Sequence, residues 1–145
     1  MAFARYQVIG TFFDWLRDRK RRRVWSHDLA ARRRGEDLAH RFLRRRGFTI
    51  VARNYRLASG DAEADLIARD GDALVIVEVK SRASDEYGPP ERAIGEDKRR
   101  HLLRVAREYS RKSGTPWEKV RFDVVTVLFT TPPKIELFRD ALSKN

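Results

Sequence analysis

The sequence contains no cysteine and no apolar run long enough to cross a membrane. Without cysteine the chain has no disulfide framework and no thiolate metal site, which suits a reducing cytosol, and we expect a cytoplasmic protein. A membrane span needs roughly eighteen apolar residues. Basic residues follow the first apolar stretch instead of preceding it, so a secretory signal is not expected. Internal repeats and low-complexity stretches are also absent.

Positive charge is concentrated near the N-terminus. Residues 1–46 hold 14 Lys and Arg against 5 Asp and Glu, whereas residues 47–145 hold 18 against 16, and the formal net charge is +11. A basic segment beside a nearly neutral remainder is typical of proteins that bind a polyanion, most often nucleic acid and in some cases a membrane surface.

The 145 residues suffice for one domain with a substantial core, and their pattern predicts an α/β fold. One helix is expected from Asp28 to about Arg46, and a second from Pro90 or Glu91 to Ser113. Strands are expected at residues 48–56, in both arms of a hairpin within residues 63–82, at 121–129, and at a short edge strand, 135–138.

A domain at residues 27–140 is expected between an N-terminal extension, residues 1–26, and a short tail, residues 141–145. In the extension, apolar residues at spacings near three and four precede a basic run, as in an amphipathic helix with a basic tail. One interpretation is an extra helix packed on the domain, or a frayed arm. The other is a weak membrane-surface contact through residues 1–25.

The segment from residue 63 to residue 82 organises the chain. It holds two β-type apolar runs around Asp70-Gly71, a dipeptide typical of two-residue hairpin turns. If Arg69 pairs with Asp72 across the turn, the two runs form adjacent antiparallel strands. A slip of one residue would move every side chain to the other face, so the grouping described next depends on the register.

In that register Glu63 lies opposite Glu78, and Asp65 lies opposite Ile76 and diagonal to Glu78. All four of these side chains and Lys80 then project to one face. Three carboxylates beside one lysine need a compensating cation, and a hard divalent ion such as Mg²⁺, held by one or two carboxylates plus water, would supply it. The alternative is a solvated outer face on which Lys80 makes ordinary ion pairs.

These residues also carry a resemblance to a known family. Asp65, followed after twelve residues by Glu78-Val79-Lys80, is similar to the metal-binding half-motif of the PD-(D/E)xK nucleases, the restriction-endonuclease-like superfamily. Over about residues 34–129 the sequence resembles the YraN-like family of predicted endonucleases, which is similar to Holliday junction resolvases. The matching residues are Gly35-Glu36-Asp37-Leu38-Ala39, Asn54, Glu63-Ala64-Asp65-Leu66-Ile67, Val77-Glu78-Val79-Lys80, Lys98 and Arg121-Phe122-Asp123.

The resemblance implies a restriction-endonuclease-like αβββαβ core, with a mixed central sheet flanked by helices, and a bound Mg²⁺ or Mn²⁺. The implied metal ligands are Asp65, Glu78, the Val79 carbonyl, Glu36 and Glu63, the last two directly or through water. The implied catalytic residues are Asp65, Glu78 and Lys80, the lysine orienting a water or stabilising negative charge. Contacts to substrate phosphates are expected from Lys98, Arg82, Arg56 and Arg121.

Several of these residues also have ordinary structural roles open to them. Glu36 is alternatively a surface carboxylate paired with Arg32 or His40, four residues to either side. Lys98 lies in an apolar stripe, where it either contacts phosphate or makes an ordinary ion pair at the end of its aliphatic stem. Asp123 is expected to be a structural partner of a basic residue.

One departure from the family pattern affects Glu63. Many relatives have glycine immediately before the matching glutamate, whereas this chain has Gly60-Asp61-Ala62-Glu63. The departure predicts a loop longer by a residue or two.

The expected function is metal-dependent hydrolysis of DNA phosphodiester bonds, with a preference for structure over sequence. The alternative is a non-catalytic nucleic-acid-binding accessory protein on the same fold. A monomer would carry one site and cut one strand, so paired incision would require a homodimer.

Overall fold

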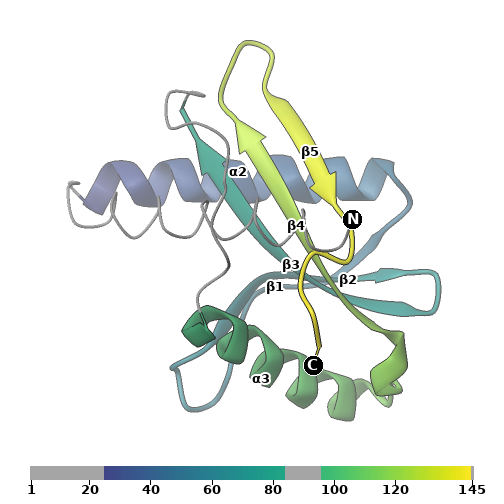
Figure 1. Cartoon of the computed structure of the whole chain (residues 1–145). Helices are drawn as coiled ribbons and strands as arrows, with labels where there is room; N and C mark the ends of the chain where they lie inside the picture. The colour runs from purple at the N-terminus through teal and green to yellow at the C-terminus, as the bar shows by residue number, and fades with distance from the viewer. Residues whose placement is uncertain (1–24, 84–95, 145) are drawn as a thin grey trace.

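The structure, a computed structural model, describes residues 25–83 and 96–144 (Figure 1). The predicted N-terminal extension lies almost entirely outside the described residues, as do residues 90–95 of the predicted second helix. The elements are α2 (Trp25–Arg45), β1 (Thr49–Arg56), β2 (Glu63–Asp70), β3 (Ala73–Arg82), α3 (Glu96–Ser113), the 3-10 helix η1 (Trp117–Lys119), β4 (Val120–Leu128) and β5 (Lys134–Phe138).

The five strands form one mixed sheet in the order β1-β2-β3-β4-β5. β3 and β4 pair in parallel, whereas the other neighbours are antiparallel. The parallel pair needs a crossover, and α3 provides it. The α/β class and the order of the elements are therefore confirmed, with α2 beginning three residues earlier than predicted.

The helices cover opposite faces of the sheet (Figure 1). Consequently the central strands carry buried apolar residues on both faces, which explains the near-continuous apolar run in β4. The core on the α3 side includes Ile67, Leu74, Ile76, Leu102, Val105 and Phe122. The core on the α2 side includes Ala39, Leu43, Leu66, Val75, Val77 and Val125.

The predicted register of the central hairpin is wrong by two residues. Asp70 pairs with Ala73, and Arg69 pairs with Leu74 instead of Asp72. The two turn residues are therefore Gly71 and Asp72, with Gly71 at a φ of 60°, and glycine in the first turn position is typical of a type II′ turn. Because side chains alternate with a period of two, an even shift leaves each one on its predicted face.

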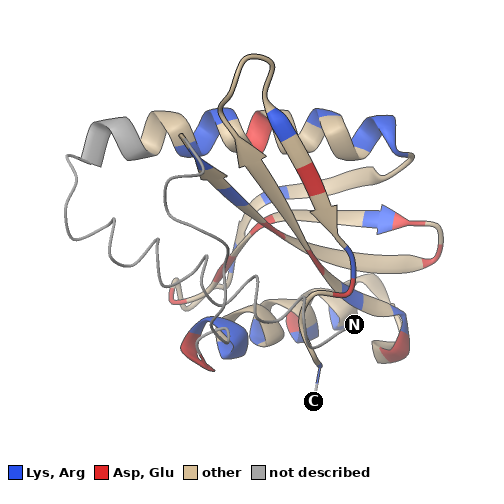
Figure 2. Ribbon diagram, turned by 45° about the horizontal axis from the view of Figure 1, so that its top comes forward, with Lys and Arg blue, Asp and Glu red and all other residues tan. Residues whose placement is uncertain are grey.

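Lys and Arg mark much of α2 and α3, whereas the middle of the sheet carries few charges (Figure 2). Among residues 25–83 and 96–144, no helix is both long enough and apolar enough to span a membrane.

Gly35 allows α2 to approach β3 closely. A Cβ built on this buried glycine would lie 2.8 Å from Cβ of Ser81 and 2.9 Å from its Oγ. Cβ of Ser81 is fixed to the strand backbone and cannot rotate away, so an alanine would require the helix or the strand to shift. Since Glu36 follows directly, this contact also sets the position of Glu36 over the sheet.

Asp123 is the one fully buried acidic residue among the largest fully buried side chains of the described chain. It accepts hydrogen bonds from Arg121 Nε at 2.9 Å and from the backbone N–H of Asp140 at 2.9 Å. Arg121 also pairs with Asp70 at 2.8 Å, next to the hairpin turn. This network ties β4, the hairpin and the segment after β5 together, as expected for a structural role of Asp123.

We predict that Gly35→Ala lowers the free energy of unfolding by about 1–2 kcal/mol, measured by urea denaturation. Overpacking costs roughly 1–3 kcal/mol and the higher helix propensity of alanine returns up to about 1 kcal/mol. In a Ser81→Gly background, where the obstructing Cβ is gone, Gly35→Ala should lower the free energy of unfolding by less than it does in the wild-type protein. Additive effects of the two substitutions would contradict the close contact.

Asp123→Ala should lower the free energy of unfolding by roughly 2–4 kcal/mol, because it leaves Nε of the half-buried Arg121 and the Asp140 N–H without their acceptor, while Arg121 keeps its contact with Asp70. The matched control is Asp72→Ala. Asp72 is exposed and its 3.0 Å ion pair with Lys119 lies at the surface, so its loss should be barely measurable. Equal losses in the two variants would argue against the network.

Candidate functional site

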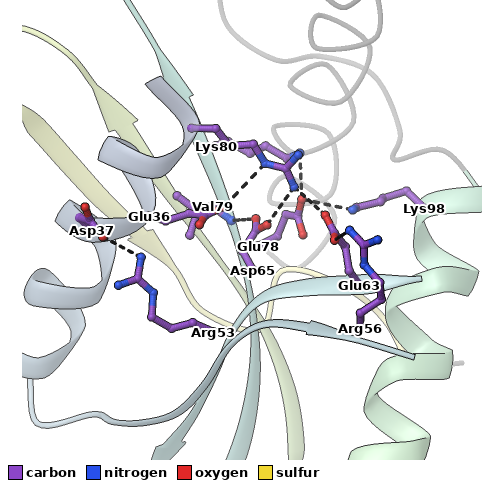
Figure 3. Close-up of polar contacts among 11 residues, drawn as sticks. Glu36, Asp37, Arg53, Arg56, Glu63, Asp65, Glu78, Val79, Lys80 and Lys98 are labelled. Carbon is purple, nitrogen blue, oxygen red and sulfur yellow. Dashed lines mark hydrogen bonds and ion pairs between the residues drawn. The ribbon is translucent and has the colours of Figure 1, made fainter. Parts of the chain in front are cut away.

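The site lies where β2 and β3 separate. The pairs between these strands run from Asp70 with Ala73 to Leu66 with Val77. At the next position Oδ2 of Asp65 accepts a hydrogen bond from the backbone N–H of Val79 at 2.8 Å (Figure 3). The Asp65 side chain thus satisfies the Val79 N–H, which lies beyond the last backbone pair of the hairpin ladder. The same hydrogen bond holds the carboxylate in the interior, where Asp65 is only 3 % exposed.

Glu78, which is 4 % exposed, joins β3 to α3 through two lysines. Its Oε1 lies 2.9 Å from Nζ of Lys80 on the same strand and 3.3 Å from Nζ of Lys98 on α3. Lys80 is buried, and the Lys98 side chain is 30 % exposed. Figure 3 shows Lys80 and Lys98 approaching Glu78 from different sides.

Arg32 joins α2 to the acidic residues of β2. Its Nη2 lies 2.8 Å from Oε1 of Glu63 and 3.4 Å from Oδ1 of Asp65. Its Nε lies 3.6 Å from Oε1 of Glu36, one turn further along α2. The other oxygen of Glu63 pairs with Arg56 of β1 at 2.8 Å. Four acids from three elements therefore surround one small region.

The two buried carboxyls on β2 and β3 have opposite pKa shifts. Burial raises the pKa of Asp65, and the neighbouring charge of Glu78 raises it further. Burial also acts to raise the pKa of Glu78, but Lys80 and Lys98 outweigh it and hold that pKa below its ordinary value. Glu78 is thus the more readily ionised of the two, and Asp65 the more readily protonated.

Burial and neighbouring charges also shift the pKa values of the surrounding groups. Burial lowers the pKa of Lys80 in spite of its contact with Glu78, whereas the charge of Glu78 outweighs burial and raises the pKa of Lys98. Burial raises the pKa of Glu36, opposed by Arg32 and by a hydrogen bond from Asn54, whose backbone has a φ of 50°. For Glu63, Arg56 and Arg32 overcome burial and lower the pKa.

Asp65 and Glu78 offer buried carboxylate oxygens of the kind that a hard divalent cation binds. Oε2 of Glu78 is buried and accepts no hydrogen bond from the part of the chain that the structure describes, so an acceptor is left over inside the site. Mg²⁺ is commonly held by one or two carboxylates, with water in its remaining positions. Within residues 25–83 and 96–144 no group of three acidic or histidine side chains is arranged to hold a metal.

The structure brings most of the predicted site residues together. These are Asp65, Glu78, Val79, Lys80, Glu36, Glu63, Lys98 and Arg56. Arg121 lies apart, at the other end of β4, where it pairs with Asp70 and Asp123. Arg82 is half-buried at the end of β3, and its carbonyl accepts the N–H of Phe129.

Glu36 combines features of its two predicted roles. It pairs with Arg32, as the structural alternative predicted. It is not a surface carboxylate, however, because only 3 % of it is exposed and it lies beside the other acids. Similarly, Lys98 does make an ion pair, and its partner is the buried Glu78.

Arg32 is the site residue that the sequence patterns did not single out. It entered only as one of two surface partners for Glu36. Its contacts with Glu63 and Asp65 span more than thirty residues of sequence and depend on where α2 crosses the sheet. The available signal was the i,i+4 spacing from Glu36 along one helix face.

Comparison with known proteins supports the predicted YraN-like relationship. Residues 35–127 match the protein family described as "Uncharacterised protein family UPF0102". A UPF0102 protein of Solibacter usitatus is 49 % identical over 124 residues, which cover 86 % of this chain and 92 % of the relative. One from Rhodococcus jostii is 47 % identical over 118 residues, covering 80 % and 98 %, and one from Desulfosudis oleivorans is 43 % identical over 113 residues, covering 78 % and 89 %.

We predict that Asp65→Asn stabilises the protein in EDTA at pH 8. Because folding raises the pKa of Asp65, its unfavourable contribution is absent below the unfolded pKa near 4 and grows as pH rises toward the folded value. The variant should gain roughly 1–3 kcal/mol at pH 8 and almost nothing at pH 4. Urea denaturation across this range measures the difference.

The control is Asp72→Asn at the exposed hairpin turn. Lys119 lowers the pKa of Asp72, so removing this charge should give no gain at any pH. A gain at Asp65 that does not change with pH would contradict the raised pKa.

Proposed function

The chain belongs to the UPF0102 family, and we propose that it is a metal-dependent nuclease that hydrolyses phosphodiester bonds in DNA. One observation carries the proposal. Two buried carboxylates, Asp65 and Glu78, meet a buried lysine, Lys80, where two strands separate. Keeping three ionisable groups in the interior is costly for stability, and such groups gather where chemistry needs them.

The fold supports the proposal. The order α2-β1-β2-β3-α3-β4 is the αβββαβ order that the resemblance to restriction-endonuclease-like proteins implies. Asp65 lies on β2 and Glu78 and Lys80 on β3, the places that the PD-(D/E)xK half-motif requires.

Asp65 and Glu78 would hold Mg²⁺ or Mn²⁺ together with the Val79 carbonyl. Glu36 and Glu63 lie close enough to this region to join through water. A bound divalent ion supplies polarisation of the scissile phosphate and a lowered pKa for a water ligand. The hydrogen bond from Val79 N–H fixes the Asp65 carboxylate, so it needs little reorganisation to act as a ligand.

Lys80 would stabilise the negative charge that develops on the phosphate. Its Nζ is held at 2.9 Å from Glu78 in a buried setting, where a donor aimed at developing charge is worth far more than in water. Lys98 approaches the same oxygen from α3 with a partly exposed side chain. It would extend the positive potential from the buried site toward a phosphate outside it.

Exposed arginines on α2 would position the nucleic-acid backbone. Residues Arg33, Arg34, Arg41, Arg44 and Arg45 are all exposed and fall within an arc of about 120° at 100° per residue. Figure 2 shows basic positions along this helix. Contacts to phosphates set orientation without reading bases, so binding should depend on salt and on DNA structure more than on sequence.

A second candidate function is nucleic-acid binding without turnover. The observation that favours it is that each of the four acids already has a basic partner in the structure. Such pairing alone would stabilise a polar site that never holds a metal. The two candidates differ in whether removing one carboxylate abolishes an activity or only alters stability.

We predict that the protein cuts labelled DNA in the presence of Mg²⁺ or Mn²⁺, tested on duplex, single-stranded, flap and four-way-junction substrates. Asp65→Asn should lose at least about 100-fold in rate and Lys80→Ala a similar amount, because each removes a group acting on the transition state. DNA affinity should change little in either variant.

Lys119→Ala is the matched control for loss of a lysine, since Lys119 pairs with Asp72 at the far end of the hairpin. It should cut at the wild-type rate. If no substrate is cut while binding persists and weakens steeply with salt, the non-catalytic function replaces the nuclease.

A further inference from the structure

Arg32 occupies an unusual position between solvent and the buried acids. Its side chain is 45 % exposed, yet Nη2 lies within hydrogen-bonding distance of both Glu63 and Asp65. Nε of the same guanidinium faces Glu36. A single flexible side chain therefore touches three of the four acids of the site.

The charges of the described site balance. Its acids are Glu36, Glu63, Asp65 and Glu78, and its bases are Arg32, Arg56, Lys80 and Lys98. A divalent cation bound at the buried Asp65 and Glu78 would add two positive charges to this set. That excess favours the departure of a base, the arrival of an anion, or both.

The four bases are not equally able to leave. Lys80 is buried beside Glu78, and Arg56 contacts only Glu63 among the ion pairs described. Lys98 pairs with Glu78 and not with Asp65 among those pairs. Arg32 contacts the carboxylate of Asp65 itself, and its side chain is the more exposed of these two partners.

We propose that Arg32 is a phosphate-binding residue that exchanges partners: it pairs with Glu63 and Asp65 when no divalent cation is bound, and moves to a substrate phosphate when one binds. The inference rests on the proposed nuclease function and names a residue of that site. A guanidinium suits both positions, because its planar array of donors matches carboxylate and phosphate oxygens alike.

The exchange has two measurable consequences. Without DNA, Arg32 competes with the cation for carboxylate oxygens, so its removal should tighten cation binding. With DNA, Arg32 should contribute to affinity when a divalent cation is present and contribute little in EDTA. An arginine with a purely structural role would show neither pattern.

In the first experiment the metal-free full-length protein is titrated with Mn²⁺. Calorimetry and the electron paramagnetic resonance signal of free Mn²⁺ measure the binding. Arg32→Ala should bind Mn²⁺ about tenfold more tightly than wild type. Arg33→Ala, an exposed neighbour on the same helix, should bind with wild-type affinity. Unchanged or weaker binding by Arg32→Ala would overturn the proposal.

The second experiment measures affinity for a labelled four-way junction and a duplex in Ca²⁺, which substitutes for Mg²⁺ as a hard oxygen-binding ion, and in EDTA. Arg32→Ala should weaken binding at least fivefold in Ca²⁺ and less than twofold in EDTA. Arg33→Ala should weaken it equally in both. Equal effects for Arg32→Ala in the two buffers would refute the exchange.

Two further variants separate the possible failures. If Arg32→Ala does not fold, Arg32→Lys keeps the charge but loses the planar fork, and should show half or less of the wild-type cation dependence of DNA binding. Asp65→Asn tests the metal site itself. Suppose that Mn²⁺ binds to the wild type and that Asp65→Asn abolishes Mn²⁺ binding. Wild-type Mn²⁺ and DNA affinities in Arg32→Ala would then reject only the exchange of partners. If Mn²⁺ does not bind, the proposed metal-dependent function fails as well.

Discussion

The hydrogen bond between the Asp65 carboxylate and the Val79 N–H is the contact on which the arrangement of the site depends. It closes the hairpin ladder with a side chain at the point where the backbones of β2 and β3 part. A carboxylate fixed there has Glu78 as a neighbour, and the repulsion between them must be offset. Lys80, Lys98 and Arg32, from β3, α3 and α2, provide the compensating charge. The site therefore couples four elements, β2, β3, α2 and α3, through electrostatics as well as through apolar packing.

The sequence predicted the α/β class and the grouping of the charged hairpin residues because both depend on periodicity. Apolar runs and turn residues located the helices and strands, and the alternation of side chains grouped Glu63, Asp65, Glu78 and Lys80. The grouping survived an error of two residues in the hairpin register, since parity decides which face a side chain occupies. An error of one residue would have separated Asp65 from Glu78 in the prediction.

Residues whose partners lie far apart in sequence were harder to place. Arg121 belongs to the family motif, but the parallel pairing of β3 with β4 puts it beside Val75, three positions from the level of Glu78, and its partners are Asp70 and Asp123. The role of Arg32 depends on the crossing of α2 over the sheet, which helix periodicity does not determine. Both cases concern long-range geometry, and neither the motif nor the local pattern contains that information.

The Arg121 network makes the two ends of the hairpin physically different. At the turn end, Arg121 connects Asp70 to Asp123 and so fastens β2 to β4 across the intervening strand. At the other end the same two hairpin strands diverge around mutually repelling acids. A fastened end allows the divergent end to hold like charges, or to readjust around a new occupant, without loosening the sheet as a whole. Rigidity and chemical adaptability are thus assigned to opposite ends of one pair of strands.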